Sequence, residues 1–123
     1  MSINDYFLET ASLLKKCTEG DLGKQVDEAI RQISATLKGD RCVLICGNGG
    51  SAADANHIAG ELVGRYLKER RAFKAIALSA DPAVLTAIGN DYGYENVFSR
   101  QVEALAETNG IRSEEHTSEL QSH

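Results

Sequence analysis

Apolar residues follow a helical period at the start of the chain and form short continuous runs farther on. Two stripes, separated by Gly20 and Gly23, have apolar residues that recur every three or four positions. Their members are Ile3, Phe7, Leu8, Ala11 and Leu14, and then Val26, Ile30, Ile33 and Leu37. This spacing predicts two amphipathic helices. The runs at residues 42–46 and 73–78 instead predict strands, and the first is typical of a strand covered on both faces in a parallel sheet.

A helix is predicted after each of these strands. Residues 52–66 keep a helical spacing of apolar residues, and Asp81-Pro82 supplies an N-cap and a first-turn proline for the next helix. Residues 89–93 (GNDYG) are predicted to form a loop, and a last stripe predicts a helix over residues 96–107. The alternation favours a parallel α/β layer with right-handed crossovers. Two strands are too few for such a sheet, so the pattern predicts an interrupted one.

The composition is that of one globular domain. The 123 residues are 42% hydrophobic and 25% charged, with a formal net charge of -5. Such a chain lacks the basic face that a general nucleic-acid binder needs. No apolar stretch approaches the ~20 residues that span a bilayer, and the N-terminus lacks the order of a secretory signal. We therefore predict a cytoplasmic protein with no nucleic-acid or membrane partner.

The last residues differ in composition from the rest of the chain. Residues 112–123 (RSEEHTSELQSH) contain one large aliphatic residue and no helical stripe. The string resembles the translation of a widely used short-read sequencing adapter joined to an interrupted gene, and the other interpretation is a disordered terminus. On the first interpretation, residues 1–110 are the N-terminal part of one domain and residues 111–123 are non-native. His116 and His123 are then not candidate ligands.

The glycine-rich turn after the first predicted strand is a candidate anion site. Residues 48–51 (NGGS) lie between an apolar strand and a helix, at the edge of the sheet where open α/β proteins bind ligands. Gly49 and Gly50 allow the backbone to approach an oxyanion, and Ser51 can cap the helix or donate its hydroxyl. A tight turn without a ligand explains the pattern equally well. The run is neither the nucleotide P-loop nor the dinucleotide fingerprint.

A polar stripe on the following helix carries candidate chemistry. At about 100° per residue, one face holds Asp54, His57, Glu61 and Arg65. His57 and Glu61 stand at i and i+4, so they could ligate a divalent metal or place a general base beside an imidazole. The alternative is a solvated face with an exposed histidine and a Glu61–Arg65 ion pair.

The pair Asn90-Asp91 has a similar ambiguity. It lies between Gly89 and Gly93, where an Asn-Asp pair is ordinary turn chemistry. The same polar side chains would also suit a loop that binds sugar hydroxyls.

Three ordered motifs resemble the phosphoheptose isomerases, a branch of the sugar isomerase (SIS) family. They are CGNGGS at residues 46–51 with the helix that follows, GNDYG at residues 89–93, and FSR at residues 98–100. The matching positions on the helix are Asp54, His57, Glu61, Leu62, Gly64, Arg65 and Tyr66. The resemblance extends from the first helix to about Glu107. It implies a flavodoxin-like parallel sheet of the SIS fold, truncated here and led by two helices, and a homotetramer with active sites at subunit interfaces.

The resemblance also implies an activity and residue roles. The reaction is the interconversion of sedoheptulose 7-phosphate and glycero-manno-heptose 7-phosphate through an enediolate, in heptose biosynthesis for bacterial surface polysaccharide. Glu61 would be the catalytic base and, with His57, a ligand of one zinc ion per active site. The implied substrate-binding residues are Asn48, Gly49, Gly50, Ser51, Glu61, Arg65, Asn90 and Asp91.

Several parts of the family pattern have no match in this chain. They are a serine/threonine-rich phosphate loop, the glutamine and histidine that complete the zinc shell, and the acid histidine, so we expect the chain alone to be inactive. The alternative function is a non-catalytic SIS adaptor, such as the relative that tethers bacterial replication initiator molecules, or a sugar-phosphate-binding regulatory protein. Glu61 favours an enzyme, because that adaptor lacks a carboxylate there. An isomerase acting on another sugar phosphate is a second rival.

Overall fold

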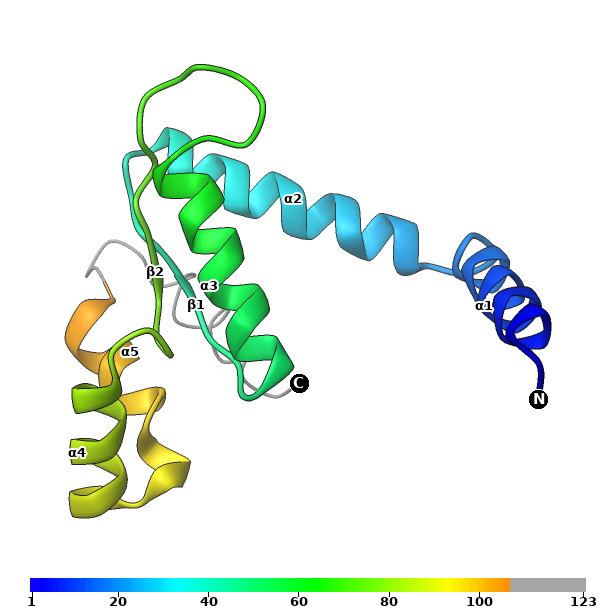
Figure 1. Ribbon diagram of the computed structural model, residues 1–123. Helices are drawn as coiled ribbons and strands as arrows, with labels where there is room; N and C mark the ends of the chain where they lie inside the picture. Colours follow the sequence, from blue (N-terminus) through cyan, green and yellow to red (C-terminus); the bar gives the residue numbers. More distant parts are fainter. Residues whose placement is uncertain (107–123) are drawn as a thin grey trace. The chain divides into compact units, whose positions relative to one another are not determined.

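The computed structural model describes residues 1–106, and the predicted non-native tail at residues 111–123 lies outside them (Figure 1). The chain divides into two parts, Met1–Ala35 and the part from Thr36 onward. Each is described by itself. Within residues 1–106, no helix has the length and apolar character needed to cross a membrane.

The two leading helices form as predicted. Helix α1 (Ile3–Cys17) opens with a capping box, in which the Asp5 amide donates to Ser2 Oγ (3.1 Å) and the Ser2 amide donates to Asp5 Oδ2 (3.0 Å). Helix α2 (Leu22–Lys38) continues into the second part. The apolar stripes that predicted both helices remain largely exposed within the described chain, and only Leu37 of α2 is buried.

The second part is a parallel α/β unit. Strands β1 (Val43–Ile45) and β2 (Ala75–Ala77) pair in parallel, with Val43 opposite Ala75. Helix α3 (Gly50–Val63) connects them. Helix α4 (Pro82–Tyr92), the short 3-10 helix η1 (Tyr94–Asn96) and helix α5 (Ser99–Leu105) follow β2. These are the only two strands in residues 1–106, as the sequence predicted.

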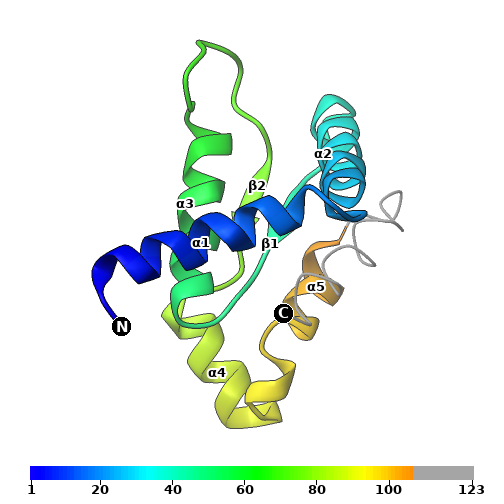
Figure 2. The same cartoon turned by 90° about the vertical axis from the view of Figure 1, so that its right-hand side faces the viewer.

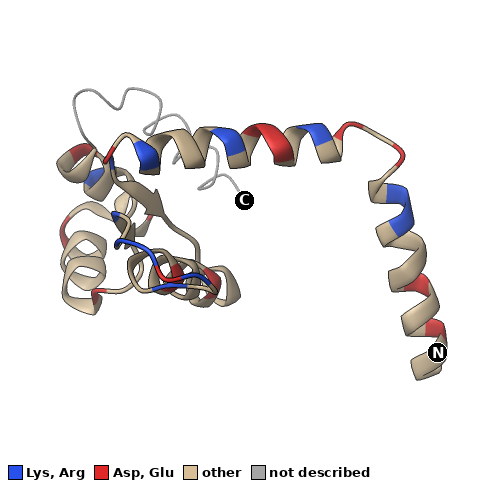
Figure 3. Cartoon of the chain, turned by 90° about the horizontal axis from the view of Figure 1, so that it is seen from above, with Lys and Arg blue, Asp and Glu red and all other residues tan. Residues whose placement is uncertain are grey.

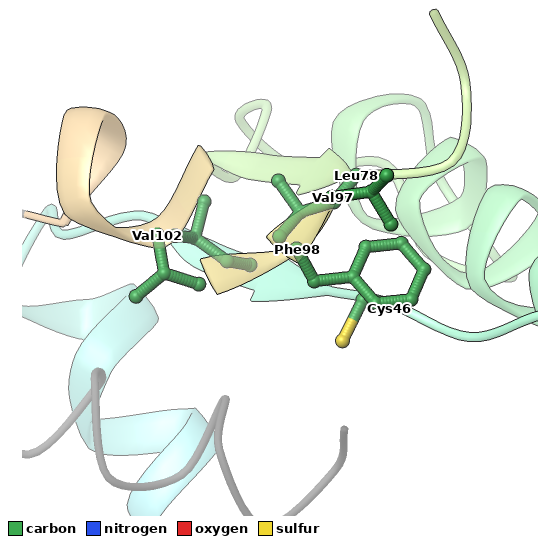
Figure 4. Packing of buried hydrophobic residues seen from close by; sticks show 6 residues of the cluster. Cys46, Leu78, Val97, Phe98 and Val102 are labelled. Carbon is green, nitrogen blue, oxygen red and sulfur yellow. The ribbon is translucent and has the colours of Figure 1, made fainter. Parts of the chain in front are cut away.

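Helices cover both faces of the sheet (Figures 1 and 2). On one face, Ile45 and the β2 alanines pack against Ala55 and Ala59 of α3. On the other, alternate β1 residues pack with the segment after β2. The buried members of that second cluster are Leu44, Cys46, Leu78, Val97, Phe98 and Val102 (Figure 4). This arrangement places the carboxyl ends of both strands at one edge, where each chain segment turns into a helix.

The predicted loop at residues 89–93 is wrong. Helix α4 continues through Asn90 and Asp91 to Tyr92, and Gly93 ends it at φ 93°. Gly89 alone does not break the helix, because glycine lowers helix stability by only about 1 kcal/mol. The last helix also begins at Ser99 rather than near residue 96, because η1 precedes it.

Candidate functional site

Glycines shape the turn between β1 and α3. A Cβ atom on Gly47 would lie 2.6 Å from Ser51 Cβ and 2.8 Å from the Ser51 carbonyl carbon. Gly49 has φ 55° and ψ -123°, a backbone conformation that only glycine adopts readily. Gly47 therefore lets the first turn of α3 approach the end of β1, while Gly49 reverses the chain into the helix.

The entrance of α3 has no side-chain cap. Gly49 stands at the N-cap position, and no acidic residue lies in the first turn. The proposal that Ser51 caps the helix is therefore wrong, because Ser51 lies inside the helix and its own amide donates to the Asn48 carbonyl (2.9 Å). An entrance of this kind presents backbone amides and the positive end of the helix dipole to an anion.

Tyr94 links the glycine-rich turn to the segment after α4. Its hydroxyl donates a hydrogen bond to Asn48 Oδ1. Asn90 and Asp91 lie nearby in sequence, in the last turn of α4, where Asn90 Nδ2 donates to Asp91 Oδ1 (3.0 Å). Sequence reasoning did not include Tyr94 among the site residues, although it directly follows the GNDYG motif.

His57 and Glu61 come together on α3 as predicted. His57 Nε2 lies 3.0 Å from Glu61 Oε1, and the two side chains are 74% and 37% exposed. Their helix is held by the opposite side, where Ala55 and Ala59 are buried against the sheet. The pair therefore stands on a fixed helix and remains accessible.

The nitrogen and the carboxylate oxygen of this pair suit zinc, but they are not a complete site. Zinc in proteins usually has four ligands, of which a catalytic site takes three from side chains. Within residues 1–106, no group of three or more His, Cys, Asp or Glu residues is placed to hold a metal ion. The described chain thus offers two donors.

The predicted alternative of a Glu61–Arg65 ion pair is wrong. Helix α3 ends at Val63, and Gly64 turns the chain away, so Arg65 is no longer one helical turn above Glu61. Arg65 Nη1 instead pairs with Glu69 Oε2 at 3.2 Å. Within the described chain, Glu61 therefore pairs with His57, and Arg65 does not join this pair.

The two halves of the site are separated along α3. With a rise of about 1.5 Å per residue, Glu61 lies roughly 16 Å from Gly50 along the helix axis. Side chains lean back toward the helix N-terminus, which shortens this separation. A single ligand that contacts both the glycine-rich turn and Glu61 must therefore be extended.

Two arginines after α3 were also missed by sequence reasoning. Arg70 Nη2 donates to the Glu61 carbonyl (2.8 Å), and Arg71 Nη2 donates to the Leu37 carbonyl (3.1 Å). Arg70 is half-buried, whereas Arg71 remains exposed. The available sequence signal was the aromatic Phe73, which both guanidinium groups stack against, at 4.3 and 5.1 Å from its ring centroid.

The fold and the site together define a class of protein. The sequence matches the SIS domain family over residues 5–110, so the chain belongs to that family.

Within this family, the chain is similar to phosphoheptose isomerases. A phosphoheptose isomerase of Helicobacter pylori is 52% identical over 103 residues, which are 84% of this chain and 53% of the relative. One from Syntrophotalea carbinolica is 44% identical over 111 residues, covering 90% of this chain and 56% of that relative. The chain thus spans about half the length of the curated relatives that it matches.

Solved structures agree with the observed fold. The phosphoheptose isomerase of Neisseria gonorrhoeae superposes with a TM-score of 0.73 at 39% identity, covering 85% of this chain and 53% of that one. The enzyme from Francisella tularensis gives a TM-score of 0.74 at 37% identity, covering 85% and 55%. The expected α/β fold of the SIS type is confirmed.

Proposed function

We propose that this chain is the N-terminal part of an aldose–ketose isomerase that converts sedoheptulose 7-phosphate to glycero-manno-heptose 7-phosphate. The observation that carries the proposal is the His57–Glu61 pair, which presents an accessible carboxylate on a helix whose entrance has no side-chain cap. The names of the relatives support the same activity. The enzyme would act in the cytoplasm as a homotetramer, supplying heptose for surface polysaccharide.

Glu61 would be the base. Moving a carbonyl from C2 to C1 requires removal of a proton from C1 of the open-chain ketose, delocalisation of the charge as an enediolate, and return of a proton to C2. A carboxylate can take the first proton, and His57 beside it fixes the orientation of that carboxylate through the 3.0 Å contact. The acid that completes the transfer would come from outside residues 1–106.

His57 and Glu61 would also hold the zinc ion, with further ligands from outside the described chain. A zinc ion bound there would act as a Lewis acid on the developing oxyanion. The donor types fit, since one imidazole nitrogen and one carboxylate oxygen lie on adjacent helical turns.

The binding residues would divide the substrate between them. Asn48, Gly49, Gly50 and Ser51 would contact one part of it at the entrance of α3, and Asn90 with Asp91 would bind hydroxyl groups. The distance along α3 between the glycine-rich turn and Glu61 suits an open seven-carbon sugar phosphate better than a compact ligand. Arg65 would compensate charge, although it pairs with Glu69 in the described chain.

The test is an isomerase assay on a completed chain, in which residues 1–106 are joined to the remaining C-terminal part of the Helicobacter pylori relative. We expect turnover of sedoheptulose 7-phosphate, and at least a thousandfold loss on Glu61→Gln with the tetramer intact. The matched control is Glu103→Gln, which makes the same change at an exposed position of α5. Retained turnover in Glu61→Gln would remove Glu61 as the base, and sugar-phosphate binding without any turnover would favour the regulatory alternative.

The 123-residue chain made alone should show no turnover and no tight zinc binding. Residues 1–106 hold only two zinc donors in contact, and the implied phosphate loop has no match there. Activity of the isolated chain would show that these residues suffice and would contradict the proposed division of the site.

A further inference from the structure

The carboxyl end of α3 is closed by a side chain from the loop that follows it. The last carbonyl groups of a helix have no partner within the helix, and α3 has no basic residue in its own last turn. Arg70 supplies the missing donors. Its Nη2 donates to the Glu61 carbonyl (2.8 Å), and its Nη1 donates to those of Leu62 (3.1 Å), Gly64 (3.4 Å) and Arg71 (2.9 Å).

Arg70 is itself held in place. It is half-buried, and its guanidinium lies 4.3 Å from the centroid of the Phe73 ring. The Phe73 amide donates to the Leu62 carbonyl (3.1 Å), so the loop is fastened to the same helical turn by its backbone as well. The loop appears in Figure 1 between α3 and β2, and its basic residues are coloured blue in Figure 3. A positive charge at this end also complements the helix dipole.

We propose that Arg70 is a positioning residue for Glu61, holding the helical turn from which the Glu61 carboxylate projects. This inference rests on the proposed function of Glu61 as the base. The reason is geometric, because one guanidinium nitrogen bonds the backbone of Glu61 itself while the other bonds the next carbonyl. A displacement of about 1 Å at a catalytic group can cost a hundredfold in rate.

Arg71 provides a matched control within the same loop. It also stacks against Phe73 and also donates to a carbonyl in the last turn of a helix, but that helix is α2, and the acceptor is the Leu37 carbonyl (3.1 Å). Arg71 additionally pairs with Asp40 (3.3 Å). The two arginines therefore have the same kind of structural role, and only Arg70 contacts the helix of the candidate base.

The experiment compares Arg70→Lys with Arg71→Lys in the completed chain. Lysine keeps the positive charge but cannot bond two carbonyls with a planar fork. We expect Arg70→Lys to lower kcat ten- to a hundredfold with KM changed by less than about threefold, and Arg71→Lys to keep the parent kcat while unfolding at lower denaturant concentration. A purely structural role for Arg70 predicts that both variants behave like Arg71→Lys, and that result would overturn the proposal.

A second measurement separates this proposal from the proposed function. In the 123-residue chain, the Gly64 amide donates to the Gly60 carbonyl (2.9 Å) and so reports on closure of the last turn. Its hydrogen exchange should accelerate at least tenfold in Arg70→Lys, with that of Ala59 unchanged. If the unsubstituted completed chain shows no isomerase activity, the proposed function has failed, and an unchanged Gly64 exchange rate would then overturn the role of Arg70 as well.

Discussion

The turns after β1 and β2 stand at the same edge of the sheet, and each leads into a helix. After β2, Asp81 Oδ1 accepts hydrogen bonds from the amides of Ala83 (2.9 Å) and Val84 (3.3 Å), and Pro82 begins α4 without an amide to satisfy. After β1, Gly49 begins α3 with no side-chain bond at all. The start of α4 is thus capped by a carboxylate, whereas the start of α3 has no side-chain cap.

The difference in capping indicates which of the two turns suits an anionic ligand. The Asp81 carboxylate occupies the amides of α4 and brings a negative charge to the positive end of its dipole. Nothing of that kind stands at α3, where glycines bring the backbone close instead. Equivalent positions in the topology therefore differ in how the helix start is capped, and one or two residues at each turn determine the difference.

Gly47→Ala should give the largest change in stability, because it fills the space that the open turn needs. The new Cβ would meet Ser51 Cβ at 2.6 Å and the Ser51 backbone at 2.8 Å, and backbone cannot move aside cheaply. We expect a loss of about 3 kcal/mol in the free energy of unfolding, measured by urea denaturation. The control is Gly60→Ala, within α3 and with no atom within 4 Å of its Cβ position, which should stabilise by about 0.5–1 kcal/mol. Equal stability of the two variants would show that the turn is not tight.

Asp81→Ala would remove the side-chain cap from the start of α4. It removes the acceptor for two amides of α4 and should cost about 1 kcal/mol in the same denaturation experiment. Asp81→Asn keeps an oxygen acceptor without the charge and should remain within a few tenths of a kcal/mol of the parent. If the alanine variant matches the asparagine variant, the cap does not stabilise α4 and the contrast between the two turns loses its basis.

Much of this contrast could be predicted from local patterns in the sequence. Asp81-Pro82 is a local signal for a helix start, and the spacing of His57 and Glu61 places them on adjacent turns of any helix. The apolar runs at the two strands predicted the parallel pair correctly, since a covered strand leaves no polar alternation.

The rest depended on contacts that no local pattern contains. Arg70 reaches the end of α3 only because the following loop folds back, and Tyr94 reaches Asn48 across the sheet edge. The continuation of α4 through Asn90 was missed because glycine and asparagine are turn residues on average, whereas this helix ends at Gly93, which has a positive φ.

Tyr94→Phe should have a smaller effect, confined to ligand binding at the open turn. It removes the hydroxyl that donates to Asn48 and leaves the ring. We expect KM for sedoheptulose 7-phosphate to rise about threefold in the completed chain, with kcat unchanged, because one neutral hydrogen bond contributes about 1 kcal/mol or less. Tyr92→Phe is the control, because its ring keeps the contact with Arg100 at 3.8 Å. Equal KM values in both variants would mean that Asn48 needs no partner.

Asp40 lies at the opposite edge of the sheet, where the strands begin. Its substitution should have the smallest effect of those considered, and this effect is on stability. Asp40 Oδ2 lies 3.3 Å from Lys74 Nζ, which directly precedes β2, and Oδ1 lies 3.3 Å from Arg71 Nη1. Lys74 first, and then Arg71, lower the pKa of the Asp40 carboxyl below its ordinary value of 3.8. Since the folded pKa is the lower one, this contribution to stability is present above the ordinary pKa and is lost as the pH falls through the folded one.

Asp40→Asn isolates that charge without disturbing the backbone. Asparagine tolerates the positive φ of 58° at this position, so only the ion pairs are removed. We expect a small loss of stability near neutral pH, because the carboxylate is exposed and its pairs are screened by water, with a further decrease of the difference at high salt. The difference between parent and variant should vanish as the pH is lowered below the folded pKa, measured by urea denaturation across the acid range. A difference that persists in acid would mean that Asp40 acts through its shape rather than its charge. Side chains at this edge would then stabilise the beginning of each strand by local geometry, as the Asp81 side chain stabilises the beginning of α4.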